Sequence, residues 1–203
     1  MLVRRNTAVI TGFGPFKDIL INPSWLAVSA LPASISSFSI VKKEMAVDYQ
    51  QVTAIVPELI NEYKPQLVIH VGVGHAGALK LETMANNTGY NQPDINGHLP
   101  SKQSVVQYPA QEPMCTSIPV DEIVHQACAL GLAVQPSNNA GRFLCEFIYA
   151  TTMYYSEKCM HGIPCLFIHV PPLDAPYSHH ELNHALLQVV ELVIAQLEMQ
   201  IQI

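Results

Sequence analysis

The sequence predicts an α/β fold: a single-domain, three-layer sandwich whose largely parallel, twisted central sheet carries helices on both faces. Segments with strand periodicity alternate with segments of helical periodicity, and most connections between them are short. The 203 residues contain no internal repeat, low-complexity tract or linker, so we expect one domain, residues 1–203.

In the first half of the chain, capping residues and apolar spacing mark the elements. Asn22 followed by Pro23 is typical of a helix N-terminus, and Asp48 caps a longer helix that Pro57 is expected to kink. The predicted strands are Thr7–Gly12, Phe38–Val47 and Gln66–Val71, and the predicted helices are Ser24–Leu31 and the segment from Asp48 to Tyr63.

The second half continues the alternation after a long polar segment. Gly72–Gly77 is a glycine-containing turn, and Ala78–Ala85 is expected to be extended. Residues 86–119 are rich in proline and show little periodicity, so we interpret them as a flap over a site. The later elements are predicted to be a helix Val120–Leu132, a strand Ala133–Gln135, a helix Gly141–Tyr155, a strand Pro164–Val170 and an amphipathic helix that begins at Ser178.

Composition excludes several classes of protein. The chain is 49% hydrophobic and 13% charged, which excludes an intrinsically disordered protein. It has no apolar run long enough to span a membrane, and its N-terminus is unlike a secretory signal. Its five cysteines are odd in number and irregularly spaced, so we expect a cytoplasmic protein without a disulfide framework.

The net charge of −6 is distributed unevenly. Residues 103–203 hold nine acidic residues, and their only cations are Arg142 and Lys158. Because no basic cluster occurs in either half, we expect neither nucleic acid nor an anionic membrane as a partner. A small molecule or a peptide is the expected ligand.

Gly72-Val-Gly74-His-Ala-Gly77 has the GxGxxG spacing of dinucleotide-binding sites and follows a predicted strand. The residues after Gly77 reach Asn86 too soon to form the helix on which a pyrophosphate would sit. A tight turn beside a ligand is therefore favoured, with dinucleotide binding as the alternative.

His180-Glu-Leu-Asn-His184 matches the HExxH pattern of zinc hydrolases, in which two histidines bind the metal and the glutamate acts as a base. Ser178 and Glu181, however, fit a Ser-x-x-Glu capping box, which gives the glutamate a structural role. No third ligand with suitable spacing is visible in the sequence. We therefore expect no metal site, and a zinc hydrolase that uses His180 and His184 is the alternative.

Other cysteine and histidine groups invite a metal interpretation that their spacing does not support. Each candidate group lacks the second ligand pair of a four-ligand site; the groups are Cys159 and His161 with Cys165, and His125 with Cys128. We predict that Cys128 is a core residue of a helix and Cys165 a core residue of a strand, because free cysteine packs as a small hydrophobe.

Cys145 stands near the start of a predicted helix, after the small-residue turn Ser137-Asn-Asn-Ala-Gly141. Backbone N–H groups and the helix dipole at this position stabilise a thiolate and can also bind an oxyanion. The sequence therefore indicates a cysteine nucleophile, with a buried inert cysteine as the alternative.

His169 ends a core strand, so we expect it at the carboxyl edge of the sheet, where α/β proteins build their sites. A histidine beside a cysteine can serve as its base. Glu82, just beyond the glycine turn, could orient that histidine and stabilise its protonated form. His70 lies inside a strand, and we expect it to be a hydrogen-bonded core residue.

Four segments resemble, in order, the motifs of the pyroglutamyl-peptidase I family of cysteine peptidases, also called pyrrolidone-carboxylate peptidases. They are Thr11-Gly-Phe-Gly-Pro-Phe16 with Asn22-Pro-Ser24, Glu82-x-x-Ala85-x-Asn87, Ser137-x-x-Ala-Gly-x-Phe-Leu-Cys145 and Phe167-Ile-His169-Val-Pro-Pro. The similarity covers essentially the whole chain, and four ordered motifs are more specific than any single one.

The resemblance implies an enzyme that removes an N-terminal pyroglutamyl (5-oxoprolyl) residue from peptides through a thioester acyl-enzyme, with no metal or organic cofactor. It implies Cys145 as the nucleophile, His169 as the general acid and base, and Glu82 as the carboxylate that orients His169. Members of the family occur as monomers or as tetramers. The implied pocket for the pyroglutamyl ring consists of Phe13, Phe16, Phe143 and Leu144.

The chain departs from the family pattern at four positions. Thr83 stands where many members have Arg, and Val73 stands where many bacterial members have Gln. Asn139 stands where members more often have Asp, and Glu146 stands where they more often have Asp or Asn. The departures leave a non-catalytic binder of pyroglutamyl peptide ends as a further alternative.

Overall fold

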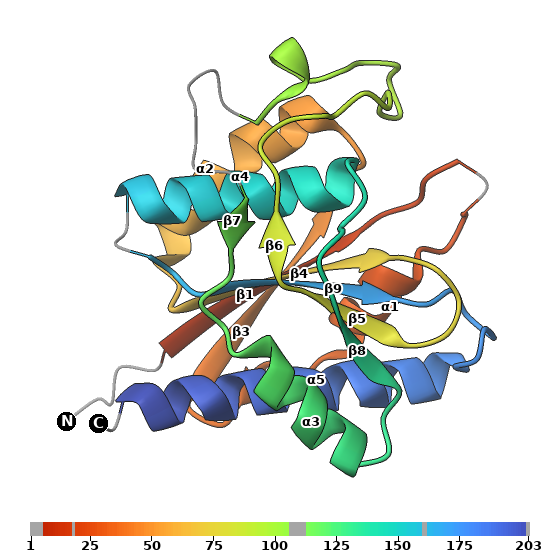
Figure 1. Ribbon diagram of the computed structural model, residues 1–203, viewed down its shortest axis with the longest axis vertical. Coiled ribbons are helices and arrows are strands. Elements are labelled where there is room, and N and C mark those ends of the chain that lie inside the picture. The colour runs from red at the N-terminus through yellow and green to blue at the C-terminus, as the bar shows by residue number, and fades with distance from the viewer. Residues whose placement is uncertain (1–5, 18, 106–112, 160–161, 202–203) are drawn as a thin grey trace.

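Residues 6–17, 19–105, 113–159 and 162–201 are described by the computed structural model (Figure 1). The strands are β1 (Asn6–Phe13), β2 (Ser34–Ile35), β3 (Phe38–Met45), β4 (Leu67–Val73), β5 (Leu79–Glu82), β6 (Met84–Ala85), β7 (Met114–Cys115), β8 (Val134–Ser137) and β9 (Cys165–Val170). The helices are α1 (Pro23–Ala30), α2 (Tyr49–Tyr63), α3 (Val120–Ala129), α4 (Leu144–Cys159) and α5 (His179–Ile201), with a short 3₁₀ helix at Ser101–Gln103.

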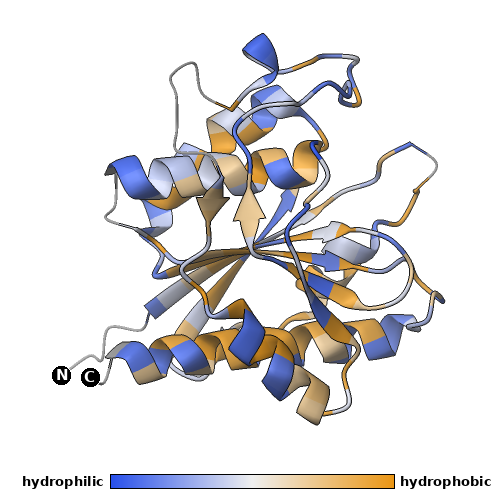
Figure 2. Cartoon of the chain, viewed as in Figure 1, coloured by the Kyte–Doolittle hydropathy of each residue, from blue (hydrophilic) through white to orange (hydrophobic). Residues whose placement is uncertain are grey.

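The predicted α/β architecture is confirmed. Within the described residues, one sheet has seven strands in the order β2-β3-β1-β4-β9-β5-β8, and a second sheet pairs β6 with β7. In Figure 1, α2 and α4 lie above the large sheet and α3 and α5 lie below it. Each face packs on its helices through a buried hydrophobic cluster, and α1 belongs to the cluster on the α5 side. Hydrophobic residues accordingly follow the strands and the inner sides of the helices (Figure 2).

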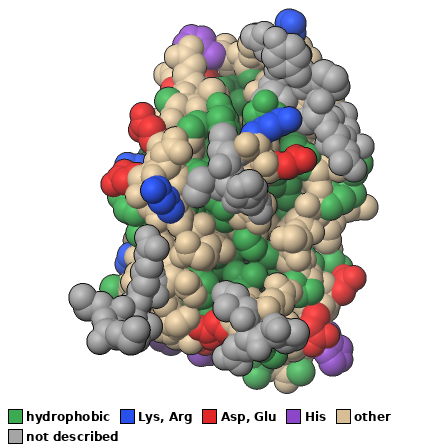
Figure 3. All heavy atoms as spheres, turned by 90° about the vertical axis from the view of Figure 1, so that its left-hand side faces the viewer, with side chains coloured by type: hydrophobic (Ala, Val, Ile, Leu, Met, Phe, Trp, Pro, Cys, Tyr) green, Lys and Arg blue, Asp and Glu red, His purple; other side chains and the backbone are tan. Residues whose placement is uncertain are grey.

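Apart from the buried Glu82, Asp94 and Glu146, the described Asp, Glu, Lys and Arg side chains are partly or fully exposed. Figure 3 shows the molecule from the left-hand side of Figure 1, and on the part drawn in colour the Lys and Arg side chains are scattered singly. None of the described helices is long and apolar enough to cross a membrane.

The strand directions set the position of the site. β1, β3, β4 and β9 pair in parallel, so their carboxyl ends meet at one edge of the sheet. β5 runs antiparallel to β9 and parallel to β8. The sheet is therefore largely parallel, as predicted, but the reversed β5 brings its own residues alongside the carboxyl end of β9.

Three differences from the predicted elements have local causes. The strands β2 and β7 were not expected, because two residues are too short to show a periodicity, whereas β5 and β6 fall within the segment Ala78–Ala85 that was expected to be extended. β7 lies within the segment interpreted as a flap, of which residues 106–112 are outside the described residues. α4 begins at Leu144 rather than at Gly141, because Gly141 and Arg142 have positive φ angles of 98° and 52°.

The start of α1 is anchored to the end of β1. The side chain of Asn22 accepts a hydrogen bond from the Ser24 backbone N–H at 3.0 Å and donates one to the Gly14 carbonyl at 2.9 Å. Gly12 permits this close approach, because a Cβ atom there would lie 2.7 Å from the Trp25 Cα. The loop between β1 and α1 is thereby fixed at its base.

The two cysteines expected in the core have different environments. Cys165 is buried, as predicted, and its burial raises the pKa of its thiol. Cys128 is exposed, so its assignment to the helix core is wrong. The buried face of α3 is formed by Val120, Ile123 and Ala127, and Cys128 is turned away from it by the helical rotation of about 100° per residue.

His70 is the hydrogen-bonded core histidine that the sequence predicts. It is 1% exposed, and its two ring nitrogens lie 2.7 Å from the Thr11 hydroxyl and 2.8 Å from the Thr152 hydroxyl. Burial lowers its pKa to about 3. The pair of hydroxyls links β1, β4 and α4 through a neutral imidazole.

His70 should make folding stability depend on pH. Because its pKa falls from the ordinary 6.5 to about 3 on folding, the unfolded chain binds a proton that the folded chain does not. We expect the free energy of unfolding to decrease as the pH falls from 6.5 towards 3. His70→Gln removes the titrating group and should flatten this part of the profile. Urea unfolding at several pH values measures the effect, with the exposed His125→Gln as control; equal profiles for wild type and His70→Gln would contradict it.

Candidate active site

The three residues predicted as nucleophile, base and orienting carboxylate come together at the carboxyl edge of the parallel strands. Glu82 is the last residue of β5, His169 lies near the end of β9, and Cys145 is the second residue of α4. The His169 Nδ1 atom lies 2.8 Å from the Glu82 Oε1 atom, and Cys145 lies close enough to the His169 side chain to raise its pKa. The imidazole therefore bridges the carboxylate and the thiol.

Burial differs along this chain of three residues. The Glu82 side chain is fully buried, the His169 side chain is 11% exposed, and Cys145 is partly exposed. The second carboxylate oxygen of Glu82 has no hydrogen-bond partner among the described residues. Glu82 would look like an ordinary surface carboxylate in isolation, and its burial follows from the pairing of β5 between β9 and β8.

The electrostatics of His169 favour its protonated form. Burial alone lowers the pKa of His169, but the hydrogen bonds and charges of Cys145 and Glu82 outweigh it and raise the pKa to about 9. The backbone of Glu82 is also fixed, because the Tyr149 hydroxyl donates a hydrogen bond to the Glu82 carbonyl at 3.0 Å.

Two glycines of the GxGxxG segment make room for the side chains of Cys145 and His169. A Cβ atom on Gly72 would lie 2.7 Å from the Cys145 Sγ, and one on Gly74 would lie 3.0 Å from the His169 Cβ. After Gly77 the chain enters β5 and not a helix, so the dinucleotide alternative lacks its phosphate-binding element. The tight turn beside a site is the interpretation that fits.

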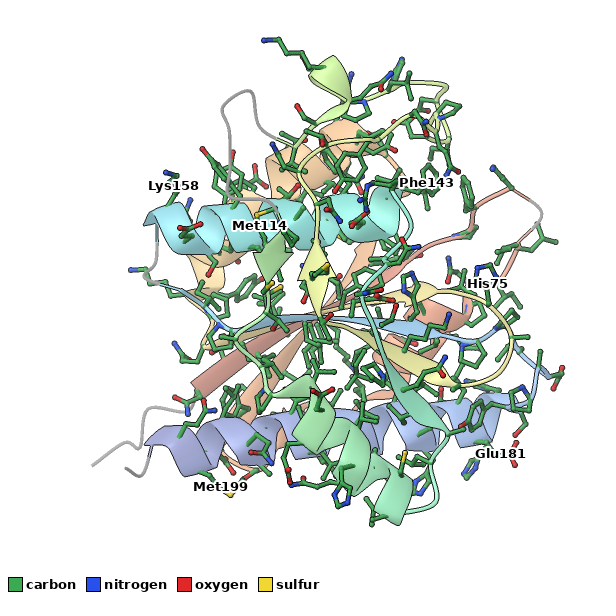
Figure 4. All side chains as sticks on the ribbon, in the orientation of Figure 1. His75, Met114, Phe143, Lys158, Glu181 and Met199 are labelled. Carbon is green, nitrogen blue, oxygen red and sulfur yellow. The ribbon has the colours of Figure 1, made fainter. Side chains whose placement is uncertain are left out.

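The four residues predicted for an aromatic pocket are close to Cys145 but differ in exposure. The rings of Phe16 and Phe143 are 5.5 Å apart and partly exposed. Phe13 and Leu144 are 2% and 1% exposed and belong to the buried cluster against which these rings and Cys145 pack. Figure 4 shows Phe143 at the N-terminal end of α4.

The sequence analysis missed Tyr49 as a member of this group. Its ring lies edge-on to Phe143 at 6.2 Å and to Phe147 at 4.8 Å. Tyr49 is buried, and its hydroxyl donates to the Gln92 carbonyl at 2.9 Å. Tyr49 is the first residue of an amphipathic helix, so its position in the sequence indicates a core residue and nothing more.

The sequence analysis names Glu146 only as a departure from the family pattern and missed that its carboxylate is buried beside Cys145. Glu146 is fully buried and accepts hydrogen bonds from the Arg142 backbone N–H at 2.8 Å and from the Arg142 guanidinium at 2.7 Å. It also accepts from the Asn86 backbone and side chain at 3.1 and 2.9 Å. An Arg four residues before a Glu at a helix start is the signal that could have found this pair.

Through these bonds, residues 86–105, the first described part of the predicted flap, are attached beside the site. Asn86 is held by Glu146, and the Asp94 carboxylate accepts from the Tyr49 backbone N–H at 3.2 Å. The Ile95 N–H donates to the Val47 carbonyl at 3.2 Å. The segment therefore packs on the starts of α2 and α4, next to the aromatic residues.

The HExxH segment lies elsewhere. The Glu181 carboxylate accepts hydrogen bonds from the Ser178 backbone N–H at 2.8 Å and hydroxyl at 2.6 Å, which confirms the capping box. His180 and His184 are exposed, and α5 lies on the other side of the sheet from α4 (Figure 4, Glu181). Among the residues described here, no three His, Cys, Asp or Glu side chains form a group that could hold a metal ion. His161, which the sequence analysis considered as a metal ligand with Cys159 and Cys165, lies outside the described residues.

Comparison with known proteins gives a consistent result. The sequence matches the family model for pyroglutamyl peptidase over residues 6–201. Human pyroglutamyl-peptidase 1 is 38% identical over 199 residues, 96% of this chain and 92% of the human protein. Pyrrolidone-carboxylate peptidase of Lactobacillus helveticus is 31% identical over 169 residues, 82% of this chain and 84% of that protein. The crystal structure of Bacillus amyloliquefaciens pyroglutamyl peptidase I has a TM-score of 0.84 at 25% identity, covering 94% of this chain and 97% of that chain.

Replacing Glu82 should change the titration of His169. In the wild type we expect the imidazole to titrate near pH 9. Glu82→Gln removes the charge that stabilises the imidazolium, so the pKa of His169 should fall by about 1 to 3 units. Nuclear magnetic resonance of the labelled imidazole measures this, with Glu181→Gln as a matched control that should leave His169 unchanged. An unaltered titration in Glu82→Gln would show that the carboxylate does not set the protonation of His169.

Proposed function

The chain belongs to the pyroglutamyl peptidase family, and we propose that it removes N-terminal pyroglutamyl residues from peptides through Cys145, His169 and Glu82. The observation that carries this assignment is the grouping of Glu82, His169 and Cys145, in which the carboxylate binds the His169 imidazole at 2.8 Å and Cys145 lies close enough to raise the pKa of the same imidazole. Nucleophile, base and orienting group are the three parts that acyl transfer by a cysteine requires.

In the proposed first step, the Cys145 thiolate attacks the carbonyl carbon that links the pyroglutamyl residue to the rest of the peptide. A C–S bond forms, and the carbonyl electron pair moves to oxygen. Backbone N–H groups of the first turn of α4 can stabilise this oxyanion, because they have no carbonyl partner within the helix. When the C–N bond breaks, His169 gives its proton to the departing amine and a thioester remains.

In the second step, water replaces the amine. The now neutral His169 takes a proton from the water molecule, whose oxygen attacks the thioester carbonyl. Collapse of this intermediate breaks the C–S bond and releases pyroglutamate, and the Cys145 thiolate and the His169 imidazolium are restored. The high pKa of His169 supports the resting ion pair from which each cycle begins.

We propose that the aromatic group at the start of α4 receives the pyroglutamyl ring. Phe16 and Phe143 offer partly exposed faces, and Phe13 and Leu144 back them from the core. The lactam ring is neutral, whereas a free α-ammonium group would be buried without a partner at considerable cost. An uncharged aromatic pocket therefore selects a blocked N-terminus over a free one.

The departure at Thr83 fits this proposal. The Thr83 backbone N–H and hydroxyl donate to the Ser137 carbonyl at 2.7 and 3.0 Å, so this residue fastens the end of β5 to the end of β8. Thr83 thereby supports the position of Glu82, its neighbour in the chain. Nothing in the structure explains Val73.

Finer points of the assignment are part of the same proposal. We propose that residues 1–203 act as one catalytic unit, since both hydrophobic clusters share one sheet. Cytoplasmic location is supported by the free thiols of the described cysteines, which are Cys115, Cys128, Cys145 and Cys165. The proposed reaction uses side chains and water, without a metal ion or organic cofactor.

Hydrolysis of a pyroglutamyl fluorogenic amide tests the function directly. Under reducing conditions we expect wild type to hydrolyse this substrate and not its prolyl or glutamyl counterparts. Cys145→Ala should lower kcat by about a thousandfold or more, because the nucleophile is lost. Cys128→Ala, which removes an exposed thiol, should retain full activity.

Other results would favour the alternative functions. Hydrolysis that survives Cys145→Ala but is lost with a chelator would support zinc chemistry at His180 and His184. Saturable binding of the pyroglutamyl amide by folded wild type, without product, would support a non-catalytic binder.

A further inference from the structure

A row of residues crosses the sheet on the face that α4 covers. The strand register places Gly72 of β4 opposite His169 of β9, and His169 opposite Lys80 of β5. On the other side of β4, the register pairs Gly12 of β1 with Val71, and Phe13 follows Gly12 as the last residue of β1, next to the end of β4 that holds Gly72. The row therefore runs from Phe13 through Gly72 and His169 to Lys80.

Lys80 has no part in the reaction described above. Opposite residues of an antiparallel pair share one face, so its side chain lies on the His169 face, with the two Cβ atoms about 4.5 to 5.5 Å apart. Lys80 is half-buried, and within the described residues it makes no hydrogen bond or ion pair. A half-buried ammonium group without a partner is suited to bind an anion that a ligand brings.

Two other described cations near the site are already engaged. The Arg142 guanidinium pairs with Glu146 at 2.7 Å. The Lys17 ammonium lies 4.8 Å from the centre of the Phe16 ring, at the β1 side of the site. Lys80 lies at the opposite end of the row, beyond His169.

The order of the row determines which part of a peptide meets Lys80. Adjacent strands are about 4.8 Å apart. The aromatic residues lie at the β1 end, the Cys145 sulfur lies above Gly72, and His169 follows. Consider a substrate with its pyroglutamyl ring at the aromatic end and its scissile nitrogen at His169. The first residue after the scissile bond would then lie over β5, where Lys80 lies.

We propose that Lys80 is a specificity residue that binds a carboxylate on the first residue after the scissile bond. This inference rests on the proposed function and names its preferred substrates. They are pyroglutamyl dipeptides, whose α-carboxylate is two bonds from the scissile nitrogen, or longer peptides with Asp or Glu at that position. Both sources present the same carboxylate chemistry to the ammonium group.

Matched substrates that differ only in this charge test the inference. One pair is pyroglutamyl-alanine and its amide, and the other is pyroglutamyl-aspartyl amide and pyroglutamyl-asparaginyl amide. We expect wild type to prefer at least one charged member by about tenfold in kcat/KM, the effect of a partly desolvated charge pair. Lys80→Met should abolish the preference, and Lys80→Arg should restore most of it.

Lys158→Met is the control, because it removes the same charge from the exposed C-terminal end of α4. It should leave both ratios unchanged. A preference confined to the first pair assigns the site to an α-carboxylate, and one confined to the second pair assigns it to an acidic side chain. Equal ratios in wild type and Lys80→Met, with the amides still hydrolysed, would overturn the inference and leave the proposed function intact.

A measurement on the wild type alone is independent of how well a variant folds. The preference for the charged substrate should decrease as sodium chloride rises from about 0.05 to 0.5 M, because salt screens a partly exposed pair. A preference that does not change with salt would contradict the role of Lys80. Failure of wild type to hydrolyse any pyroglutamyl substrate would remove the proposed function, and this inference with it.

Discussion

The hydrogen bond of 2.8 Å between Glu82 and His169 is the interaction on which the rest of the site depends. Burying a carboxylate costs free energy unless the charge is paired. One carboxylate oxygen of Glu82 binds the imidazole, and the other has no partner among the described residues. The fold supports this arrangement by reversing β5, so that its last residue lies beside β9, and by tying the Glu82 backbone to Tyr149. Together with Cys145, the hydrogen bond between Glu82 and His169 raises the pKa of His169 to about 9, and because it engages Nδ1 it leaves Nε2 free to face Cys145.

Close approach of backbones is the second constraint. Cys145 projects from α4 onto β4, and Gly72 is required there because any Cβ atom would meet both the Cys145 sulfur and the Phe167 ring. Behind this contact, His70 joins Thr11 and Thr152 and so fixes α4 against β1 and β4. The helix that carries Cys145 is thus positioned by a neutral buried network and not by loop contacts alone.

The sequence was sufficient for what short-range patterns encode. Period, caps and glycine turns predicted the long strands and helices, and a cysteine at a helix start with a histidine at a strand end predicted the site. The sequence was insufficient where the structure depends on contacts between distant parts of the chain. The reversal of β5, the burial of Glu82 and the bonds of Glu146 to Asn86 all depend on neighbours 55 or more residues away in the chain. The prediction that Cys128 is buried was wrong, because a rotation of one residue along a helix separates a core position from an exposed one.

The charges around the site are arranged asymmetrically along the row that crosses the sheet. At the β1 end, Lys17 lies over an aromatic face and Arg142 is matched by Glu146, so the aromatic residues are left without an unpaired charge. At the β5 end, Lys80 has no partner among the described residues. A neutral ring and an anionic leaving residue would therefore each find a matching environment on its own side of Cys145, and a peptide bound in the reverse direction would place its charge against aromatic rings. The strand order that brings Glu82, His169 and Cys145 together would thus also give the proposed substrate a direction.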